Sequence, residues 1–283
     1  MLPRMAKRKT KKAVSAAQPP SGGARDESIR DEPVGNEPVG NEHSGDESTG
    51  DERIAELRQR LARTLPDPRC ELDHADAWQL LVATILSAQS TDRRVNQVTP
   101  ELFRRWPTPV ALARASQADV EAVIKSTGFF RNKARAIRET SRMLAERFGG
   151  AVPHTLEEAL ELRGVARKTA NLVLGTAYGI PTGIVVDTHA ARVAQRLALS
   201  RATEPAKIEL DLLELFPRDE WIATGHRLVL HGRYVCTARA PRCTECPLNE
   251  LCPSKAAELV GSVAARAKHE AALVARRGAP GGD

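Results

Sequence analysis

Apolar residues recur at helical spacing along most of the chain. The first such run contains Ile54, Leu57, Leu61 and Leu65, and a Pro-Asp-Pro segment at 66–68 ends it. Comparable runs predict helices over residues 78–87, 119–125, 133–148, 156–162, 165–178, 188–199, 205–216 and 221–234. The one β-like run, residues 184–186, is too short to build a sheet. We therefore predict an all-α fold of about ten helices joined by short loops.

Both ends of the chain depart from this pattern. Residues 1–50 hold a basic run at 7–12, followed by four degenerate pentapeptides between residues 31 and 50. Such a segment has too few large apolar side chains to offset the entropy of ordering, so we predict a disordered tail. The extension over 260–283 is rich in Ala and Arg from about Ala265 and ends in Gly-Ala-Pro-Gly-Gly-Asp. We expect it to be partly frayed.

Charge changes this picture only slightly. The first 50 residues carry eight basic and eight acidic side chains, so the net charge of +6 belongs to residues 51–283. A basic body suits a polyanion such as nucleic acid, but a solvated surface explains the same surplus, and charge alone favours the latter. No stretch is apolar enough to cross a membrane, and no signal-peptide core follows the basic start. We expect no membrane association and no secretion.

Four of the five cysteines lie close together near the C-terminal end. Cys236, Cys243, Cys246 and Cys252 fall within 17 residues, whereas Cys70 stands alone. Clustering in a large chain favours a metal centre over a disulfide framework. Zinc sites more often use two short Cys pairs, and here only one pair is short, so spacing alone leaves zinc and iron–sulfur open. We expect Cys70 to be a minor structural residue.

Two further motifs carry candidate chemistry. The segment Leu162-Arg-Gly-Val-Ala-Arg-Lys-Thr joins two predicted helices through a Gly-containing turn. Exposed amides at such a helix start attract phosphate, although an isolated Gly-Val-Ala is more often an ordinary turn. The segment Val-Asp-Thr-His-Ala-Ala-Arg at 186–192 begins the next helix. Taken alone, Asp187 is more typical of a helix N-cap than of a catalytic residue.

In this order, the hairpin, the Asp187 string and the 6/2/5 cysteine spacing resemble the endonuclease III family. The resemblance runs from about Arg53 to Ser254, some seven-tenths of the chain. It implies a [4Fe–4S] cluster on Cys236, Cys243, Cys246 and Cys252. It also implies that Lys168, nineteen residues before Asp187, is the catalytic nucleophile and that Asp187 is its carboxylate partner.

The resemblance also implies a set of DNA contacts. They are phosphate contacts at Gly164, Val165, Ala166, Arg167, Arg239 and Arg242, insertion of Gln89 where the damaged nucleotide leaves the duplex, and an apolar wedge at Phe129, where the family usually has Leu. The family hairpin usually reads Leu-Pro-Gly-Val-Gly, so Arg163 and Ala166 depart from it. A left-handed backbone at Ala166 would cost about 1 kcal/mol.

The implied fold has two helical domains with a DNA groove between them. A central domain over 70–181 would hold the hairpin, and a second domain, 51–69 with 182–259, would hold the cluster. The implied function is a bifunctional base excision repair glycosylase and abasic-site lyase. It would be a monomer acting on double-stranded DNA with damaged bases, oxidised pyrimidines above all, or abasic sites. A bacterial source would place it in the cytoplasm at the nucleoid, and a eukaryotic source in the nucleus or mitochondrion.

Three alternatives stay open on sequence grounds. Adenine-specific mismatch glycosylases share the fold, cluster and Asp, but they lack a Lys at the position of Lys168. A non-catalytic DNA-binding module would bind without turnover and would not need both Lys168 and Asp187. A zinc-stabilised RNA-binding helical protein would contain zinc and no iron.

Overall fold

All regular structure in the described part of the chain is helical. The computed structural model describes residues 46–255 and 263–276. These ranges contain twelve α-helices and four short 3-10 helices, and they contain no strand. The prediction of an all-α fold is confirmed, and the run at 184–186 is irregular. No helix in these ranges combines the length and the apolar character needed to cross a membrane.

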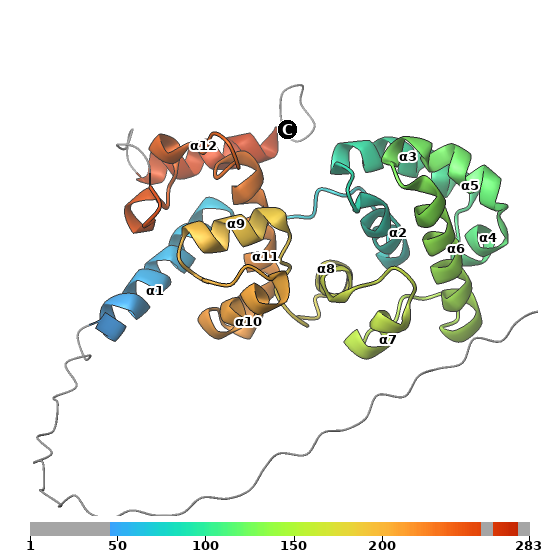
Figure 1. The fold of residues 1–283 in the computed structure, drawn as a ribbon, viewed down its shortest axis with the longest axis horizontal. Helices are drawn as coiled ribbons and strands as arrows, with labels where there is room; N and C mark the ends of the chain where they lie inside the picture. Colours follow the sequence, from blue (N-terminus) through green and yellow to red (C-terminus); the bar gives the residue numbers. More distant parts are fainter. Residues whose placement is uncertain (1–45, 256–262, 277–283) are drawn as a thin grey trace, which may run out of the picture. The chain divides into compact units, whose positions relative to one another are not determined.

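The helices fall into two groups according to the core they bury (Figure 1). The first group comprises α2 (Ala77–Ser87), α3 (Asp92–Arg105), α4 (Pro109–Arg114), α5 (Gln117–Ile124), η1 (Lys125–Thr127), α6 (Phe130–Arg147), α7 (Leu156–Glu161) and α8 (Arg167–Tyr178). The second comprises α1 (Asp46–Thr64), α9 (Thr188–Arg196), α10 (Pro205–Leu215), η2 (Arg218–Glu220), α11 (Trp221–Tyr234), η3 (Cys243–Glu245), η4 (Asn249–Leu251) and α12 (Val263–Ala275).

Helix α2 is the centre of the first core. Its side chains from Leu80 to Leu86 are all buried, so the helix is apolar around its whole circumference rather than along one stripe. It packs against α3, α6 and α8, and α6 packs in turn against α4 and α5. All fully buried members of this core lie between Leu72 and Leu174.

The second core joins distant parts of the sequence. Leu57 and Leu61 of α1 pack with buried residues of α9, α10 and α11, and with Leu248 of the cysteine-rich segment. Two buried residues of the irregular segment after α8, Ile184 and Val186, belong to the same core. The chain therefore passes from the first core to the second within the few residues before α9.

Short polar side chains start most of the helices of the first core. Asp76, Thr91, Thr108, Ser116 and Thr155 each occupy an N-cap and accept a hydrogen bond from a backbone amide within the first turn. Such caps satisfy amides that have no partner inside the helix, and each stabilises a helix by about 1 kcal/mol. The boundaries of these helices are thus encoded locally.

The structure differs from the prediction at three places. The tail predicted over 1–50 lies outside the described residues apart from 46–50, which form the start of α1. Helices α3 and α4 were not predicted, because Pro100 interrupts the pattern of α3 and α4 has six residues. The C-terminal extension is not frayed over 263–275, where it forms α12 and buries Arg266, Glu270 and Val274.

Close packing of α9 against α11 depends on a glycine. A Cβ atom at Gly232 of α11 would lie 2.9 Å from the Cβ atom of His189 and 2.9 Å from its carbonyl oxygen. Neither contact can relax without moving the α9 backbone. By contrast, a Cβ atom at Gly50 in α1 would meet nothing within 4 Å.

These two glycines predict opposite effects of the same substitution. Gly232→Ala should lower the free energy of unfolding by about 1–2 kcal/mol, because overpacking outweighs the better helix propensity of Ala. Gly50→Ala should raise it by about 0.5–1 kcal/mol, because there only the propensity acts. Chemical denaturation of both variants tests this. A stable Gly232→Ala protein would show that α9 and α11 can separate without loss.

Candidate functional site

The hairpin between α7 and α8 requires glycine at one position. Gly164 has a φ of +77°, and a Cβ atom there would lie 3.3 Å from the Cβ atom of Ala136 on α6. The next residue, Val165, is buried, and its amide donates to the Leu162 carbonyl at 3.1 Å. The turn is therefore fixed against α6 by both its backbone and its side chain.

The two departures from the usual family hairpin are accommodated without strain. Ala166 has extended backbone angles, φ −93° and ψ 168°, so the cost that a left-handed conformation would carry does not arise. Arg163 pairs with Glu139 of α6 at 2.7 Å, and its carbonyl accepts a hydrogen bond from the Thr140 hydroxyl at 2.5 Å. Arg163 thus anchors the hairpin to α6.

Helix α8 starts without a side-chain cap. Its N-cap is Ala166, which has no side-chain acceptor to offer, and Arg167 and Lys168 are its first two residues. The first amides of a helix carry partial positive charge and attract anions when no cap covers them. Lys168 is exposed, and its Nζ atom makes no hydrogen bond or ion pair with any residue in the described ranges.

A buried carboxylate engages the side chain next to Lys168. Glu209 of α10 accepts from Arg167 Nε at 3.1 Å and from Asn171 Nδ2 at 2.8 Å. The side-chain oxygen Oδ1 of Asn171 accepts from the Thr182 hydroxyl at 2.9 Å, and a Cβ atom at Gly183 would overlap with both Glu209 and Asn171. We call these five residues the Glu209 network. It fixes the irregular segment after α8 to α8 itself.

Asp187 caps helix α9, as its position in the sequence indicates. Its Oδ1 atom accepts hydrogen bonds from the amides of His189 and Ala190, both at 2.8 Å. Its Oδ2 atom has no hydrogen-bond partner within the described residues. Burial lowers the pKa of the neighbouring His189. The charge of Asp187 raises that pKa, but the positive charges of Arg233 and Arg192 lower it further. That ring is therefore neutral at pH 7.

Lys168 and Asp187 are not joined directly. Neither a hydrogen bond nor an ion pair connects the two side chains in the described part of the chain. Each stands at the start of a helix, and the Glu209 network lies on the path between them: Asn171 is three residues after Lys168, and Gly183 is four before Asp187.

The two residues expected to enter the duplex share an unusual backbone conformation. Gln89 has a φ of +53° and Phe129 a φ of +47°, and both side chains are exposed, that of Phe129 by 65%. A left-handed conformation costs a non-glycine residue roughly 1 kcal/mol or more, and it persists only where the surroundings impose it. Only three non-glycine residues in the described ranges adopt positive φ, and Ala198 is the third.

The four clustered cysteines line one cavity of about 40 Å³. None forms a disulfide. In the described residues no three His, Cys, Asp or Glu side chains converge on a single-ion position; the four thiols instead surround a shared space. Arg196 Nη1 donates to Cys236 Sγ at 3.3 Å, and His231 Nε2 lies 3.7 Å from Cys246 Sγ. Four thiols around one cavity, two of them with a side-chain nitrogen facing the sulfur, form a donor set that fits an iron–sulfur cluster.

Two arginines of α9 hold the loop that follows the first cysteine. Arg192 donates to the carbonyls of Cys236 and Gly232, and Arg196 donates to those of Thr237 and Ala238. Sequence reasoning placed Arg192 in a motif without assigning it this role, and it missed Arg196. Their spacing of four on a helix just before a cysteine-rich loop was the available signal.

The remaining predicted contact residues of this loop are exposed. The Arg239 side chain makes no hydrogen bond or ion pair with a residue in the described ranges, and Arg242 Nη1 lies 3.8 Å from Glu245 Oε2. Cys70 behaves differently from the four clustered cysteines, since burial raises the pKa of its thiol to about 11 and keeps it protonated.

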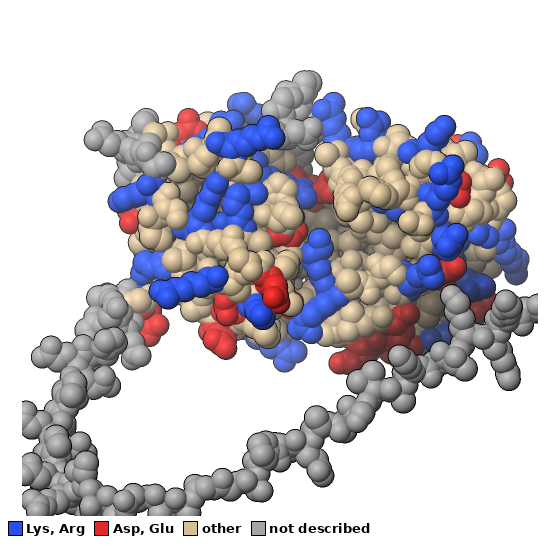
Figure 2. Space-filling view, in the orientation of Figure 1, with Lys and Arg blue, Asp and Glu red and all other residues tan. Residues whose placement is uncertain are grey.

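Basic side chains are spread over both groups of helices on the face drawn in Figure 2. Acidic side chains gather over α7, which carries Glu157, Glu158 and Glu161. The acidic helix lies immediately before the hairpin in sequence, so positive charge at the hairpin itself comes from the start of α8 rather than from α7.

Two family models match the chain. Residues 82–218 match the HhH-GPD superfamily of base excision DNA repair proteins, and residues 236–252 match the iron–sulfur binding domain of endonuclease III. Endonuclease III of Synechocystis sp. is 52% identical over 202 residues, covering 71% of this chain and 92% of the relative. That of Escherichia coli is 40% identical over 200 residues, covering 71% and 94%.

Solved structures agree with these matches. A trapped endonuclease III–DNA covalent intermediate is 40% identical, with a TM-score of 0.69, over 72% of this chain and 96% of that one. A thermostable thymine-DNA glycosylase, 22% identical with a TM-score of 0.64, shares the fold. The chain therefore belongs to the endonuclease III family of base excision repair DNA glycosylases and lyases, and it binds DNA and carries that family's [4Fe–4S] cluster.

Proposed function

We propose that Lys168 is the nucleophile of this enzyme and Asp187 its carboxylate partner, acting on double-stranded DNA with oxidised pyrimidines or abasic sites. The observation that carries the proposal is the start of α8, where an exposed, unpaired Lys168 stands beside uncapped backbone amides. A relative 40% identical to this chain has been trapped as a covalent intermediate with DNA, which supports a covalent route.

The chemistry follows from an amine at that position. The unprotonated Nζ of Lys168 attacks the sugar C1′ atom, the glycosidic bond breaks, and the base leaves with the bonding electrons and takes up a proton. Opening of the sugar ring gives an imine between Nζ and C1′. The imine acidifies the C2′–H bond, and loss of that proton expels the 3′ phosphate by β-elimination, which cuts the strand 3′ to the lesion.

Asp187 can serve this reaction while it caps α9. One carboxylate oxygen, Oδ1, is used by two backbone amides, which fixes the orientation of the group. The other, Oδ2, is left to stabilise positive charge on the sugar or to accept a proton from the amine. His189, neutral beside it, adds no competing positive charge.

The surrounding residues would hold the duplex. The amides of Gly164, Ala166 and Arg167 would bind phosphate. The Val165 amide already donates to the Leu162 carbonyl, and the Arg167 side chain is engaged by Glu209, so neither is available. Gln89 and Phe129 would occupy the gap left by the flipped nucleotide, and their exposed, left-handed backbones support this assignment. Arg239 and Arg242 would contact the backbone from the cluster loop.

The two cores support the proposed division into a central domain over 70–181 and a second domain over 51–69 with 182–259. A groove between them would receive the duplex, and the monomer would suffice, because both proposed catalytic residues belong to one chain. The presence of Lys168 disfavours an adenine-specific mismatch glycosylase, and the presence of both Lys168 and Asp187 disfavours a purely DNA-binding module.

Substitution of Lys168 should separate binding from chemistry. Lys168→Gln should abolish borohydride trapping of the enzyme on abasic-site duplex, because no other amine stands at this helix start. Binding of damaged duplex should fall by less than tenfold, about 1.4 kcal/mol, since most phosphate contacts remain. Gel analysis after borohydride and a binding titration measure the two effects. If this variant were still trapped, the nucleophile would be another amine, for example the N-terminus, and the assignment of Lys168 would be wrong.

Substitution of Asp187 should affect the two half-reactions unequally. Asn caps helices as well as Asp does, so Asp187→Asn should fold normally. Base removal should slow by about a hundredfold or more, roughly 2.7 kcal/mol, because developing charge on the sugar loses its counter-charge. Trapping on a pre-formed abasic site should persist in part, because no base has to leave. If Asp187→Asn excised the base at the normal rate, Asp187 would act only as the N-cap of α9 and would have no catalytic role.

Phe129 offers a test in which stability and function move in opposite directions. Phe129→Gly should keep or raise the free energy of unfolding, by up to about 1 kcal/mol, because glycine relieves the left-handed strain. Its kcat/KM on lesion duplex should nevertheless fall about tenfold, since no apolar group fills the gap. Phe129→Leu should retain excision. If Phe129→Gly were as active as the parent, Phe129 would not be the wedge.

Glu209 is predicted to position the site through its network. Glu209→Gln removes the buried carboxylate that accepts from the partly exposed Arg167 guanidinium and should cost about 1 kcal/mol of unfolding free energy. kcat should fall more than KM rises, because the start of α8 loses its fixed relation to Asp187. Glu214→Gln, on an exposed position of the same helix, is the control and should change neither. Equal kinetics for the two variants would limit Glu209 to a structural role.

A further inference from the structure

Helix α12 lies beyond the matched family region and has an unusual buried face. The iron–sulfur model ends at Cys252, and α12 begins at Val263. Its buried residues are Arg266, Glu270 and Val274, spaced by four, with Arg266 exposed by 3% and Glu270 not at all. A helix normally docks through apolar side chains, because a buried charge must find a partner. Two of the three residues here are charged.

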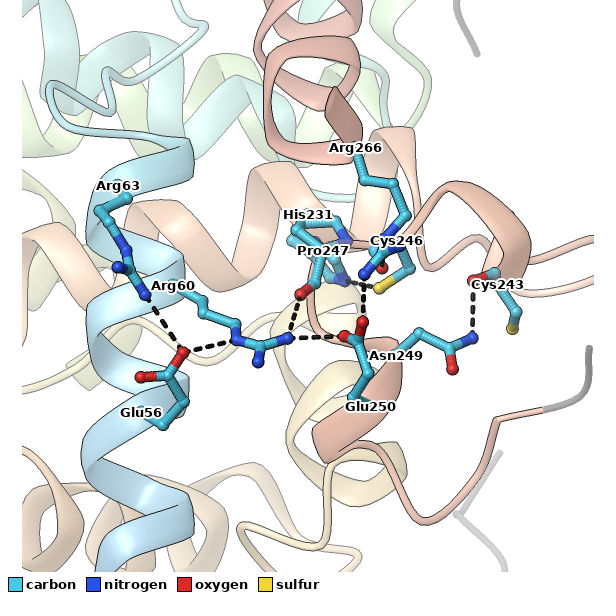
Figure 3. A network of polar contacts seen from close by, with 10 residues as sticks. All are labelled: Glu56, Arg60, Arg63, His231, Cys243, Cys246, Pro247, Asn249, Glu250 and Arg266. Carbon is cyan, nitrogen blue, oxygen red and sulfur yellow. Dashed lines mark hydrogen bonds and ion pairs between the residues drawn. The ribbon is translucent and has the colours of Figure 1, made fainter. Parts of the chain in front are cut away.

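The Arg266 side chain ends at the turn that carries the third cysteine. Its Nε atom donates to the Cys246 carbonyl at 2.9 Å, and a terminal nitrogen pairs with Glu250 (Figure 3). Arg60 of α1 donates to the Pro247 carbonyl of the same turn at 3.1 Å and also pairs with Glu250, at 2.6 Å. Two arginines from the two ends of the described chain therefore hold one turn between them.

The Glu270 side chain reaches the same cysteine through His231. Glu270 Oε1 lies 2.8 Å from His231 Nδ1, and His231 Nε2 lies 3.7 Å from Cys246 Sγ. His231 is itself 2% exposed, so water cannot replace either contact. A carboxylate on one ring nitrogen fixes which way the ring faces, and this ring faces the ligand sulfur.

We propose that α12 retains the iron–sulfur cluster: Arg266 holds the Cys246 backbone and Glu270 holds His231 against the Cys246 sulfur. Both charged side chains converge on one ligand, which ordinary docking of a helix does not require. The apolar contact that docks α12 on its neighbours is made by Val274, which packs with Leu65, Leu230 and Tyr234. Departure of the Cys246 sulfur from iron would require the turn to move, and the two charges of α12 oppose that movement.

The test compares cluster retention with stability. Iron transfer to a chelator and fading of the visible absorbance are followed in the holoprotein, with the melting temperature measured on the same samples. Arg266→Gln and Glu270→Gln should release iron about tenfold faster than the parent, the lower end for lost outer partners of metal ligands. Val274→Ala removes apolar packing of α12 without touching Cys246, and it should release iron within twofold of the parent even with an equal loss of melting temperature.

Two further variants keep the test decisive if a substitution prevents folding. Glu270→Asp keeps the charge but draws it away from His231. Arg266→Lys keeps the charge but lacks the Nε donor that meets the Cys246 carbonyl. Both should accelerate iron release, to a smaller extent. Glu214→Gln, an exposed carboxylate on α10, should have no effect. The proposal is wrong if either Arg266 or Glu270 variants stay within twofold of the parent, or if Val274→Ala accelerates release as much as they do.

Discussion

The irregular segment between α8 and α9 must hold the starts of these two helices in a fixed relation, and the Glu209 network does this. Residues 179–187 leave the first core and enter the second with no regular hydrogen-bond ladder of their own. Such a segment would be free to shift unless side chains fixed it. The Glu209 carboxylate supplies that constraint by accepting from Arg167 and Asn171, with Gly183 packed against it so closely that no side chain fits.

This arrangement explains why a buried carboxylate is tolerated next to the proposed nucleophile. A charge in the interior is stable only where its oxygens are satisfied, and Glu209 has a guanidinium and an amide as donors. Because Glu209 engages the guanidinium of Arg167, Lys168 remains the unpaired cation at the start of α8. The ion pair between Glu209 and Arg167 thus positions α8, and it also leaves Lys168 as the basic residue that is not engaged in the fold.

Sequence patterns predicted most of the fold for a local reason. Helix α2 begins after the capping residue Asp76, and helix α8 ends at the left-handed Gly179, so these limits are visible within a few residues. The cysteine spacing and the order Lys168 to Asp187 carry the resemblance to a family, and the family match bears it out. The roles of the individual site residues stay predictions.

Other features could not be predicted from the sequence, because they depend on residues that are distant along the chain. Nothing near Arg266 or Glu270 in sequence indicates that these charges are buried, since their partners are Cys246, Glu250 and His231. Likewise, the left-handed backbone of Phe129 follows from the Gly128 turn and the helix after it, not from the preference of Phe. A phenylalanine would ordinarily be assigned to a core, yet this one is 65% exposed.

The cysteine-rich segment shows how a chain with little regular structure can hold a rigid ligand set. Between Cys236 and Cys252 its only helical pieces are two short 3-10 turns, so most of its carbonyls lack partners within the segment. Arginines from three helices supply the donors: Arg60 from α1, Arg192 and Arg196 from α9, and Arg266 from α12. A guanidinium stays charged at any pH that the fold survives and presents several donors in one plane, so a single side chain can bridge a carbonyl and a carboxylate. Lysine has all its donors on one terminal nitrogen and lacks the Nε donor that meets the Cys246 carbonyl, so the charge-conserving Arg266→Lys substitution is not a neutral one. The rigidity that four sulfur ligands require is in this way supplied by side chains from helices separated by more than two hundred residues along the chain.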